Sequence, residues 1–284
     1  MKLVTFTDAA GTRVGIAAKD GIVDLKKADP DLPRDMIGLM NAWTSVHGAL
    51  ERAATRKADM PLGAVKLEAP VPRPGKVLAI GLNYADHIAE SNQKPPEQQI
   101  WFCKHVTSVN APFEPIELPK VSMMLDYEAE LVAVVGKRCK HVPKEKAHEV
   151  VFGYCAGNDV TVRDWQFKTP QWMLGKSFDT HAPFGPWIVT PDEIGDPHAL
   201  GIRAFVNGEK RQDSNTKNLV FNVFDQIALL SQAMTLEPGD IIFTGTPGGV
   251  GAAMKPPQFM KAGDVSRIEI DKIGAIEATV RPEQ

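Results

Sequence analysis

The sequence predicts an α+β fold that is rich in β-structure, with a mixed, mostly antiparallel sheet that curls or folds on itself. Short apolar runs such as residues 77–81 are bounded by turn residues, as strands are. Asn207-Gly208 is the favoured pair for a two-residue hairpin turn. Strands and helices do not alternate regularly, so neither a doubly wound sheet nor a (β/α)₈ barrel is predicted.

The first ~70 residues predict a small α/β unit. Strands fit residues 2–7, 14–18 and 21–25, and apolar residues at helical spacing predict a helix over residues 34–57. The following Pro70-Val71-Pro72-Arg73-Pro74-Gly75 makes a stiff, extended connector. We therefore expect a small N-terminal domain at residues 1–70 and a catalytic domain at residues 71–284.

The larger part predicts more strands than helices. Phe221 to Met234 has a helical pattern, and Glu237-Pro238-Gly239-Asp240 turns the chain into the next strand. The predicted strands are apolar or alternate between apolar and polar residues, and lie at 77–81, 125–135, 150–159, 241–244 and 276–280.

Composition narrows the class of protein. The 284 residues are 43% hydrophobic and 24% charged, as in a soluble globular protein. A net charge of −3 without a long basic block argues against nucleic-acid binding, and no apolar run is long enough to span a membrane. The first residues do not resemble a signal peptide, so we expect a cytoplasmic protein. The three cysteines form no CxxC pair, which disfavours a zinc site.

Two carboxylates open the apolar run at residues 125–135. Strand side chains alternate, so Glu128 and Glu130 share a face, and their repulsion in a buried setting is relieved by a divalent cation. Asp159 ends the next buried run and is a candidate third ligand. Oxygen ligands suit Mg²⁺. The alternative is that both glutamates lie on a solvated edge and that Asp159 only caps a helix.

His87 and Glu90 are three residues apart on a predicted helix, hence neighbours on one face. Glu90 can orient the imidazole as a general base. The alternative is an ordinary surface contact between the two side chains. The polar, proline-containing residues 91–97 predict a mobile flap.

Three further features are candidates for ligand contacts. Lys176 follows a glycine and can stabilise a carboxylate or a developing enolate, or be a solvated loop lysine. Residues 244–251, with four glycines, can direct backbone N–H groups at an anion or form a plain turn. Arg163 and Asp164 can simply pair on a helix surface, and Gln166 can equally donate to a substrate carbonyl.

The order of these segments resembles the fumarylacetoacetate hydrolase family over about residues 71 to 284. The resemblance rests on Gly-Leu-Asn-Tyr-Ala-Asp-His, then Glu-Ala-Glu, Asn-Asp-Val-Thr-Val-Arg-Asp-Trp-Gln, Gly-Lys-Ser-Phe-Asp and Gly-Asp-Ile-Ile-Phe-Thr-Gly-Thr-Pro-Gly-Gly-Val-Gly. Its C-terminal part is similar to one branch of this family, which contains the diketo-sugar-acid hydrolases and the mammalian fumarylacetoacetate hydrolase domain-containing proteins. The His–Glu pair resembles that of the acylpyruvases.

The resemblance implies a mixed β-roll, usually in a homodimer, that binds Mg²⁺ or Mn²⁺ and a small 2-oxo or 2,4-dioxo acid. It assigns the metal to Glu128, Glu130 and Asp159, substrate contacts to Lys176, Gln166, Gly245 and Thr246, and a water-activating dyad on a lid to His87 and Glu90.

From these residues we expect a hydrolase that cleaves a C–C bond in a 2,4-dioxo acid, with Lys176 stabilising the enolate that departs. The same enolate chemistry allows an isomerase, a tautomerase or a decarboxylase of 2-oxo acids. A non-catalytic binder of metal and small acids is the remaining alternative.

Overall fold

The computed structural model describes residues 1–90 and 94–284. Eleven strands of the described residues form one large sheet, in the order β3-β2-β1-β13-β11-β10-β16-β5-β6, with β4 on β1 and β7 on β13. These strands are β1 (Lys2–Asp8), β2 (Gly11–Ala18), β3 (Gly21–Asp24), β4 (Lys66–Leu67), β5 (Val77–Gly81), β6 (Ile100–Lys104), β7 (Val109–Asn110), β10 (Ala129–Val135), β11 (Val151–Asn158), β13 (Ala182–Val189) and β16 (Ile241–Phe243).

A second sheet of five described strands has the order β15-β14-β17-β18-β8, and β12 pairs with β9 separately. The strands are β8 (Ile116–Leu118), β9 (Leu125–Asp126), β12 (Thr161–Val162), β14 (Gly201–Val206), β15 (Glu209–Asn215), β17 (Val265–Ile270) and β18 (Gly274–Pro282). Neighbouring strands are mostly antiparallel, with β16 and β5 among the parallel pairs. The prediction of a β-rich mixed fold without a closed barrel is confirmed.

Helices lie around the two sheets. The α-helices are α1 (Leu25–Ala28), α2 (Met36–Ala54), α3 (Ala85–Glu90), α4 (Arg163–Gln166), α5 (Met173–Lys176), α6 (Pro191–Ile194) and α7 (Val223–Ala233). Short 3₁₀ helices occupy Leu62–Ala64, Val106–Ser108, Lys144–Val150, Thr216–Asn218 and Gly251–Ala253. Among the described residues, no helix combines the length and the apolar character needed to cross a membrane.

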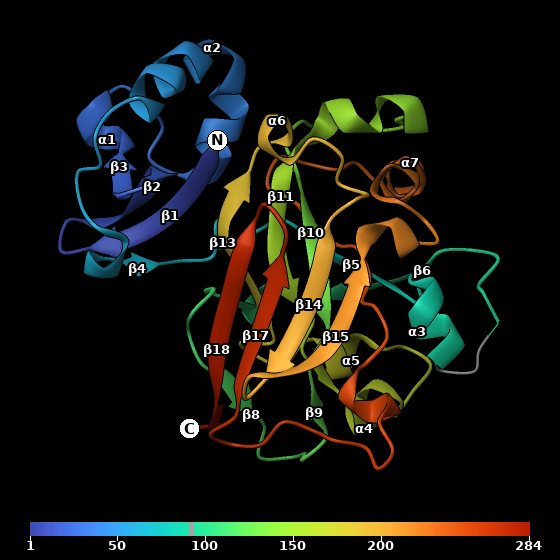
Figure 1. Cartoon of the computed structure of the whole chain (residues 1–284). Helices are drawn as coiled ribbons and strands as arrows, with labels where there is room; N and C mark the ends of the chain where they lie inside the picture. Colours follow the sequence, from blue (N-terminus) through green and yellow to red (C-terminus); the bar gives the residue numbers. More distant parts are fainter. Residues whose placement is uncertain (91–93) are drawn as a thin grey trace.

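The two sheets pack face to face, with the five-stranded sheet in front of β10, β11 and β13 in Figure 1. Leu131 and Ala133 of β10 contribute to the core shared with Ile202 and Ile268 of the second sheet. Val132, on the other face of β10, belongs to a second core that includes residues of α2. Both faces of β10 are therefore buried, which explains its continuous apolar sequence.

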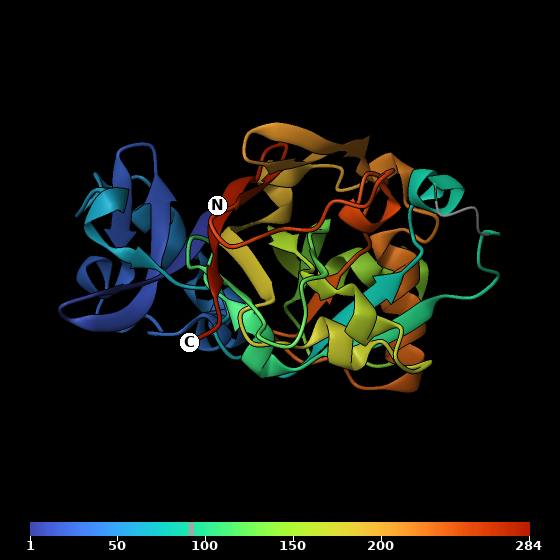
Figure 2. The same ribbon diagram turned by 90° about the horizontal axis from the view of Figure 1, so that it is seen from below.

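The N-terminal residues extend the large sheet instead of forming a sheet of their own. Leu3 in β1 pairs with Ile188 in β13, and β2 and β3 continue outward from β1. Figures 1 and 2 show this N-terminal part and α3 at opposite ends of the molecule. The boundary at residue 70 remains a prediction, because the hydrogen-bonded sheet runs across it.

The expected single strand at 125–135 is wrong at its beginning. It divides into β9 and β10, with Tyr127 and Glu128 between them. β9 pairs with β12 outside the large sheet, and the backbone N–H of Glu128 donates to Asn158 Oδ1 at 2.9 Å. A side-chain amide thus replaces the missing ladder bond, and Glu128 still lies at the buried end of β10.

The predicted hairpin at Asn207-Gly208 is present between β14 and β15, with φ of 53° and 79° at the two turn residues. We expect Gly208→Ala to lower the free energy of unfolding by about 1 kcal/mol, because an L-residue is disfavoured at positive φ. A Cβ at Gly208 meets no atom within 4 Å, so the loss reports backbone conformation alone.

Gly63→Ala is the matched control, since a Cβ there also meets no atom within 4 Å and its φ is not positive. Urea denaturation of both variants checks the prediction. Equal stability of the two variants would contradict it.

Candidate active site

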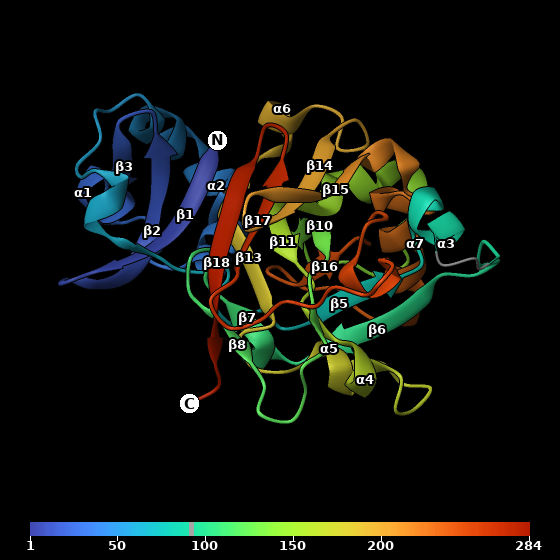
Figure 3. The same ribbon diagram turned by 60° about the horizontal axis from the view of Figure 1, so that its bottom comes forward.

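Four strand ends meet at one edge of the large sheet. Glu130 at the start of β10 pairs with Gly157 near the end of β11, and Val132 pairs with Phe243 at the end of β16. Phe243 in turn pairs with Ala79 in β5, which leads into α3. The segments that the sequence singled out therefore converge in space, and α4 and α5 lie beside them (Figure 3).

The carboxylates of Glu128, Glu130 and Asp159 are buried and offer oxygens that all lie within 4.8 Å of one another. The sequence prediction that these side chains gather at one place agrees with this geometry. An all-oxygen donor set fits a hard dication such as Mg²⁺ or Mn²⁺. Glu130 accepts a hydrogen bond from the Gly245 N–H at 2.7 Å.

Two buried lysines hold Asp159 from both sides. Lys176 Nζ donates to Asp159 Oδ2 at 2.6 Å and to Glu128 Oε2 at 2.8 Å. Lys104 Nζ donates to Asp159 Oδ1 at 2.6 Å and to the carbonyl oxygen of Val160 at 3.2 Å. Lys176 is thus not the solvated loop lysine of the alternative interpretation.

The pKa values reflect competition between burial and charge. Burial raises the pKa of Glu130 well above its usual value, and the nearby Asp159 and Glu128 carboxylates raise it further. Burial acts the same way on Glu128, but Lys176 and Arg163 outweigh it and lower the pKa of Glu128 to about 2. Glu130 is therefore the carboxylate whose negative charge the protein compensates least, which is where a bound cation relieves most repulsion.

Arg163 does not pair with Asp164 on a helix surface, so that alternative is wrong. Its Nε donates to Asp126 Oδ2 at 2.8 Å, and its Nη1 lies 2.8 Å from Glu128 Oε1. Asp164 instead accepts from Ser122 Oγ at 2.6 Å. The reason is tertiary, because pairing of β12 with β9 places Arg163 beside Asp126.

One donor of Arg163 is left over. Its Nη2 is buried and has no hydrogen-bond partner among the described residues. Nη1 also donates to Gln166 Oε1 at 3.0 Å, which orients the amide nitrogen of Gln166 as a further donor. Both side chains line the same cavity as Lys176. A buried, unpartnered guanidinium nitrogen in a cavity is a ready anchor for a carboxylate.

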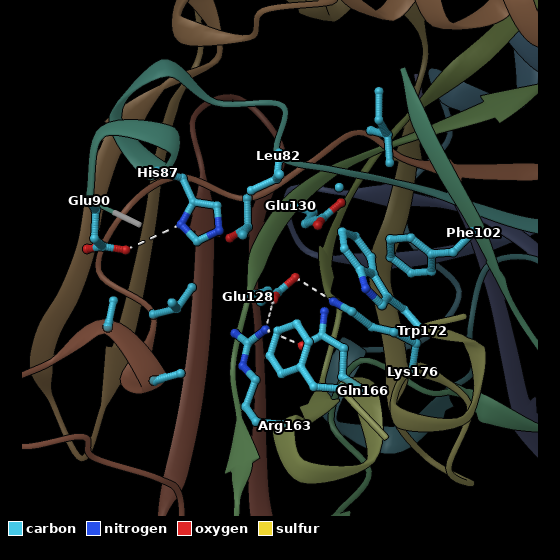
Figure 4. A pocket seen from close by; sticks show the side chains of 17 residues that line it. Leu82, His87, Glu90, Phe102, Glu128, Glu130, Arg163, Gln166, Trp172 and Lys176 are labelled. Atoms are coloured by element: carbon cyan, nitrogen blue, oxygen red, sulfur yellow. Dashed lines mark hydrogen bonds and ion pairs between the residues drawn. The ribbon is translucent and has the colours of Figure 1, made fainter. Parts of the chain in front are cut away.

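The predicted pair on α3 is formed, with His87 Nδ1 3.3 Å from Glu90 Oε1. Glu90 Oε2 accepts from the Gly249 N–H at 2.6 Å. Figure 4 shows His87 facing Glu128 across the cavity. The predicted flap at 91–97 begins just after this pair, and its residues 91–93 lie outside the described residues.

The glycine-containing loop 244–251 binds the protein's own carboxylates instead of leaving its N–H groups to a ligand. Four of its glycine N–H groups donate to Glu130, Asp86, Glu90 and Asp126, from Gly245, Gly248, Gly249 and Gly251 respectively. The glycine N–H groups of the candidate anion site are therefore bound from within the chain. The predicted substrate contact at Gly245 stays a prediction, while Thr246 lines the cavity.

The cavity has a volume of about 270 Å³, at the small end for ligand pockets. Its polar groups lie together, and its remaining wall is apolar, with the Phe102 and Trp172 rings edge to face at 5.7 Å between centroids. The lining residues are Ile80, Gly81, Leu82, His87, Glu90, Phe102, Glu128, Glu130, Arg163, Gln166, Phe167, Trp172, Lys176, Thr246, Val250, Ala252 and Ala253.

Sequence reasoning missed Lys104, Asp126 and Gln212. Gln212 is buried and joins the loop 244–251 to the start of β10. It donates to Thr246 Oγ1 at 2.8 Å and accepts from the Ala129 N–H at 2.8 Å. Isolated polar residues in ordinary strands carry no local signal of this role. Only Asp126 had a usable signal, as a carboxylate two residues before Glu128.

The fold and the site define a metal-binding class of mixed α/β proteins with a small cavity for an acid. Residues 76–281 match the family described as Fumarylacetoacetate (FAA) hydrolase C-terminal. The chain belongs to this family, as the order of its motifs indicated.

Relatives in this family carry different activities in their names. A mitochondrial oxaloacetate tautomerase of Xenopus laevis is 44% identical over 99% of this chain and 90% of that protein. A maleylpyruvate hydrolase from Sphingobium, solved with manganese(II) and pyruvate, is 36% identical with a TM-score of 0.83 over the whole of both chains. A putative HpcE protein from Mycobacterium smegmatis is also 36% identical over the whole of both chains, with a TM-score of 0.90.

Proposed function

We propose that this protein is a divalent-metal-dependent tautomerase of small 2-oxo acids, acting on the enol and keto forms of an oxaloacetate-like dicarboxylic acid. The observation that carries the proposal is the unpartnered Nη2 of Arg163, whose side chain lines a small cavity together with Glu128, Glu130 and Lys176. Asp159 lies beside them in the same cluster of carboxylates. The similarity to an oxaloacetate tautomerase supports it. The sequence alone favoured hydrolysis, and the comparisons support its alternative better.

Charge counting supports an anionic ligand. The cluster contains four carboxylates, Asp126, Glu128, Glu130 and Asp159, and three cations, Lys104, Arg163 and Lys176. With all seven groups ionised, its net charge is −1 without a metal and +1 with a dication. A buried cluster of side chains that is positive when a dication is bound attracts a carboxylate and stabilises an enolate.

The residues suggest the following mechanism. Glu128, Glu130 and Asp159 would hold Mg²⁺ or Mn²⁺, and the bound ion would supply positive charge that favours the enolate. Arg163 Nη2 and the Gln166 amide nitrogen bind a substrate carboxylate, and Lys176 Nζ stabilises negative charge at the 2-oxygen. His87 takes the proton of the 2-hydroxyl as the C2–O double bond forms, and the resulting imidazolium gives that proton to C3 as the C2–C3 double bond is lost. The keto form results with no atom gained or lost, and His87 returns to its neutral form.

Hydrolysis of an acylpyruvate-type 2,4-dioxo acid is the second candidate. It is favoured by the His87–Glu90 pair, in which Gly249 fixes the carboxylate. The similarity to a maleylpyruvate hydrolase supports this reading too. In this reaction His87 takes a proton from water, whose oxygen forms a bond to the 4-carbonyl carbon. The C3–C4 bond then breaks, so that a carboxylic acid and a pyruvate enolate form, and His87 returns the proton to C3 of the enolate.

One set of assays separates the two reactions. Ketonisation of enol-oxaloacetate is followed by its absorbance, and cleavage of maleylpyruvate or acetylpyruvate by NMR detection of pyruvate, each with Mg²⁺, with Mn²⁺ and with a chelator. We expect metal-dependent ketonisation to be the faster reaction. Pyruvate release at a higher kcat/KM identifies a hydrolase instead, and no turnover of any 2-oxo acid overturns the enzyme proposal.

His87→Gln tests the proton transfer. We expect kcat to fall by about 10²-fold, the usual contribution of a general acid or base, while the Kd for Mn²⁺ stays within about twofold. Calorimetric metal titration and the ketonisation assay provide both numbers. His47→Gln, on α2 far from the cavity, is the control. Equal loss of metal binding and activity would show that His87 is structural.

Two expectations from the sequence remain proposals. The homodimer is checked by light scattering, and the cytoplasmic location by microscopy of the tagged protein in its own cell.

A further inference from the structure

Asp86 immediately precedes His87, yet its side chain does not line the cavity. One oxygen, Oδ1, accepts from the His87 N–H at 2.8 Å and from the Gly248 N–H at 3.3 Å. The other, Oδ2, accepts from the hydroxyl of Ser214 in β15. A single carboxylate therefore ties together α3, the loop 244–251 and the second sheet.

Asp86 and Glu90 are four residues apart, so they lie on the same side of α3. Both accept N–H groups from the same loop, Asp86 from Gly248 and Glu90 from Gly249. Two such attachments one turn apart fix both the position of α3 and its rotation about its own axis. His87, between them in sequence, is then directed across the cavity toward Glu128 (Figure 4).

The loop that receives these bonds is itself rigid. Gly249 has φ of 99°, and a Cβ there would lie 2.1 Å from the carbonyl oxygen of Arg211. Its own carbonyl accepts from Tyr127 Oη at 2.9 Å. At the beginning of the segment, the Asn83 amide donates to Thr244 O at 2.8 Å. Asp86 thus attaches α3 to a loop that also packs against Arg211 of β15 and is held by Tyr127.

We propose that Asp86 is a positioning residue, which locks α3 to the glycine-containing loop and thereby sets the direction of the His87 imidazole. The proposal rests on the proposed function for its catalytic consequence, but the attachment itself does not depend on which reaction occurs.

The test uses Asp86→Ala and Asp86→Asn in the full chain. Asp86→Ala removes all three acceptor contacts, so we expect kcat to fall by about 10²-fold, the effect of misplacing a catalytic group by about an ångström. The Kd for Mn²⁺ and the KM stay within about threefold. Asp86→Asn keeps an acceptor oxygen for the two N–H groups and an amide for Ser214, so we expect it to restore most of kcat.

Hydrogen exchange provides a readout that needs no substrate. In Asp86→Ala the Gly248 and His87 amides should exchange at least about tenfold faster, since each loses its acceptor. The control is Asp35→Ala, which removes a carboxylate that caps α2 through the Gly38 N–H at 2.8 Å. We expect it to leave kcat and these two amides unchanged.

The outcomes separate the two proposals. Unchanged exchange in Asp86→Ala overturns the attachment, whatever reaction the protein catalyses. Faster exchange with unchanged kcat overturns the positioning of His87. Faster exchange in a protein that turns over no 2-oxo acid leaves the attachment standing and overturns the proposed function.

Discussion

Glu130→Gln is expected to abolish metal binding while making the metal-free protein more stable. Glu130 is fully buried, and its repulsion by Asp159 and Glu128 raises its pKa well above the usual value of 4.5. Its folded-state pKa thus exceeds its unfolded value, so its contribution to stability is present below pH 4.5 and is lost as pH rises above it. The neutral amide removes this loss and still accepts the Gly245 N–H.

Glu130→Gln stabilises the metal-free protein but weakens the binding of the dication. One negative charge about 4 Å from a unit positive charge is worth about 4 kcal/mol at an effective dielectric constant of 20, so we expect metal affinity and kcat/KM to fall at least about 10³-fold. Calorimetry measures the binding. A melting scan of the metal-free proteins at neutral pH should place the variant at least about 2 °C higher.

Glu149→Gln provides the control, because this glutamate is exposed and lies outside the cavity. It should change neither quantity. A variant of Glu130 that binds Mg²⁺ as the wild type does would remove this residue from the metal site.

Lys176→Met is expected to lower turnover and strengthen metal binding at the same time. The ammonium lies 2.8 Å from Glu128 and 2.6 Å from Asp159, where it competes electrostatically with a dication for the same two carboxylates. It is also the cavity cation placed to stabilise an enolate. We expect the Kd for Mn²⁺ to decrease about tenfold, and kcat to decrease about 10³-fold, as when a preorganised charge-stabilising donor is removed.

Lys176→Met should also change the stability of the protein, because Lys176 compensates the charge of two buried carboxylates. Without metal, Lys176→Met leaves two buried carboxylates with less positive charge and should destabilise the protein by about 3–5 kcal/mol. Saturating Mg²⁺ should therefore raise the melting temperature of the variant more than that of the wild type. The exposed Lys146→Met is the control. Weaker metal binding in Lys176→Met would mean that the lysine organises the ligands instead of competing with the metal.

Local rules were enough wherever the relevant neighbours are close in sequence. Glu128 and Glu130 lie together as their spacing of two residues predicted, although Glu128 precedes β10, helical spacing joined His87 to Glu90, and Asn207-Gly208 specified its turn. These relations depend on backbone geometry over at most three residues, so the sequence determines them. The order of the motifs along the chain further indicated the family to which it belongs.

Tertiary structure alone decided which distant groups share the cavity. Lys104 reaches Asp159, and Arg163 reaches Asp126 and Glu128, because separate strands pair and the sheet brings their ends to one edge. The same convergence brings Asp86 and Glu90 to the glycine-containing loop, where their carboxylates accept the N–H groups that were a candidate anion site. Strand pairing over such separations is determined by the packing of the whole core, which no local pattern encodes.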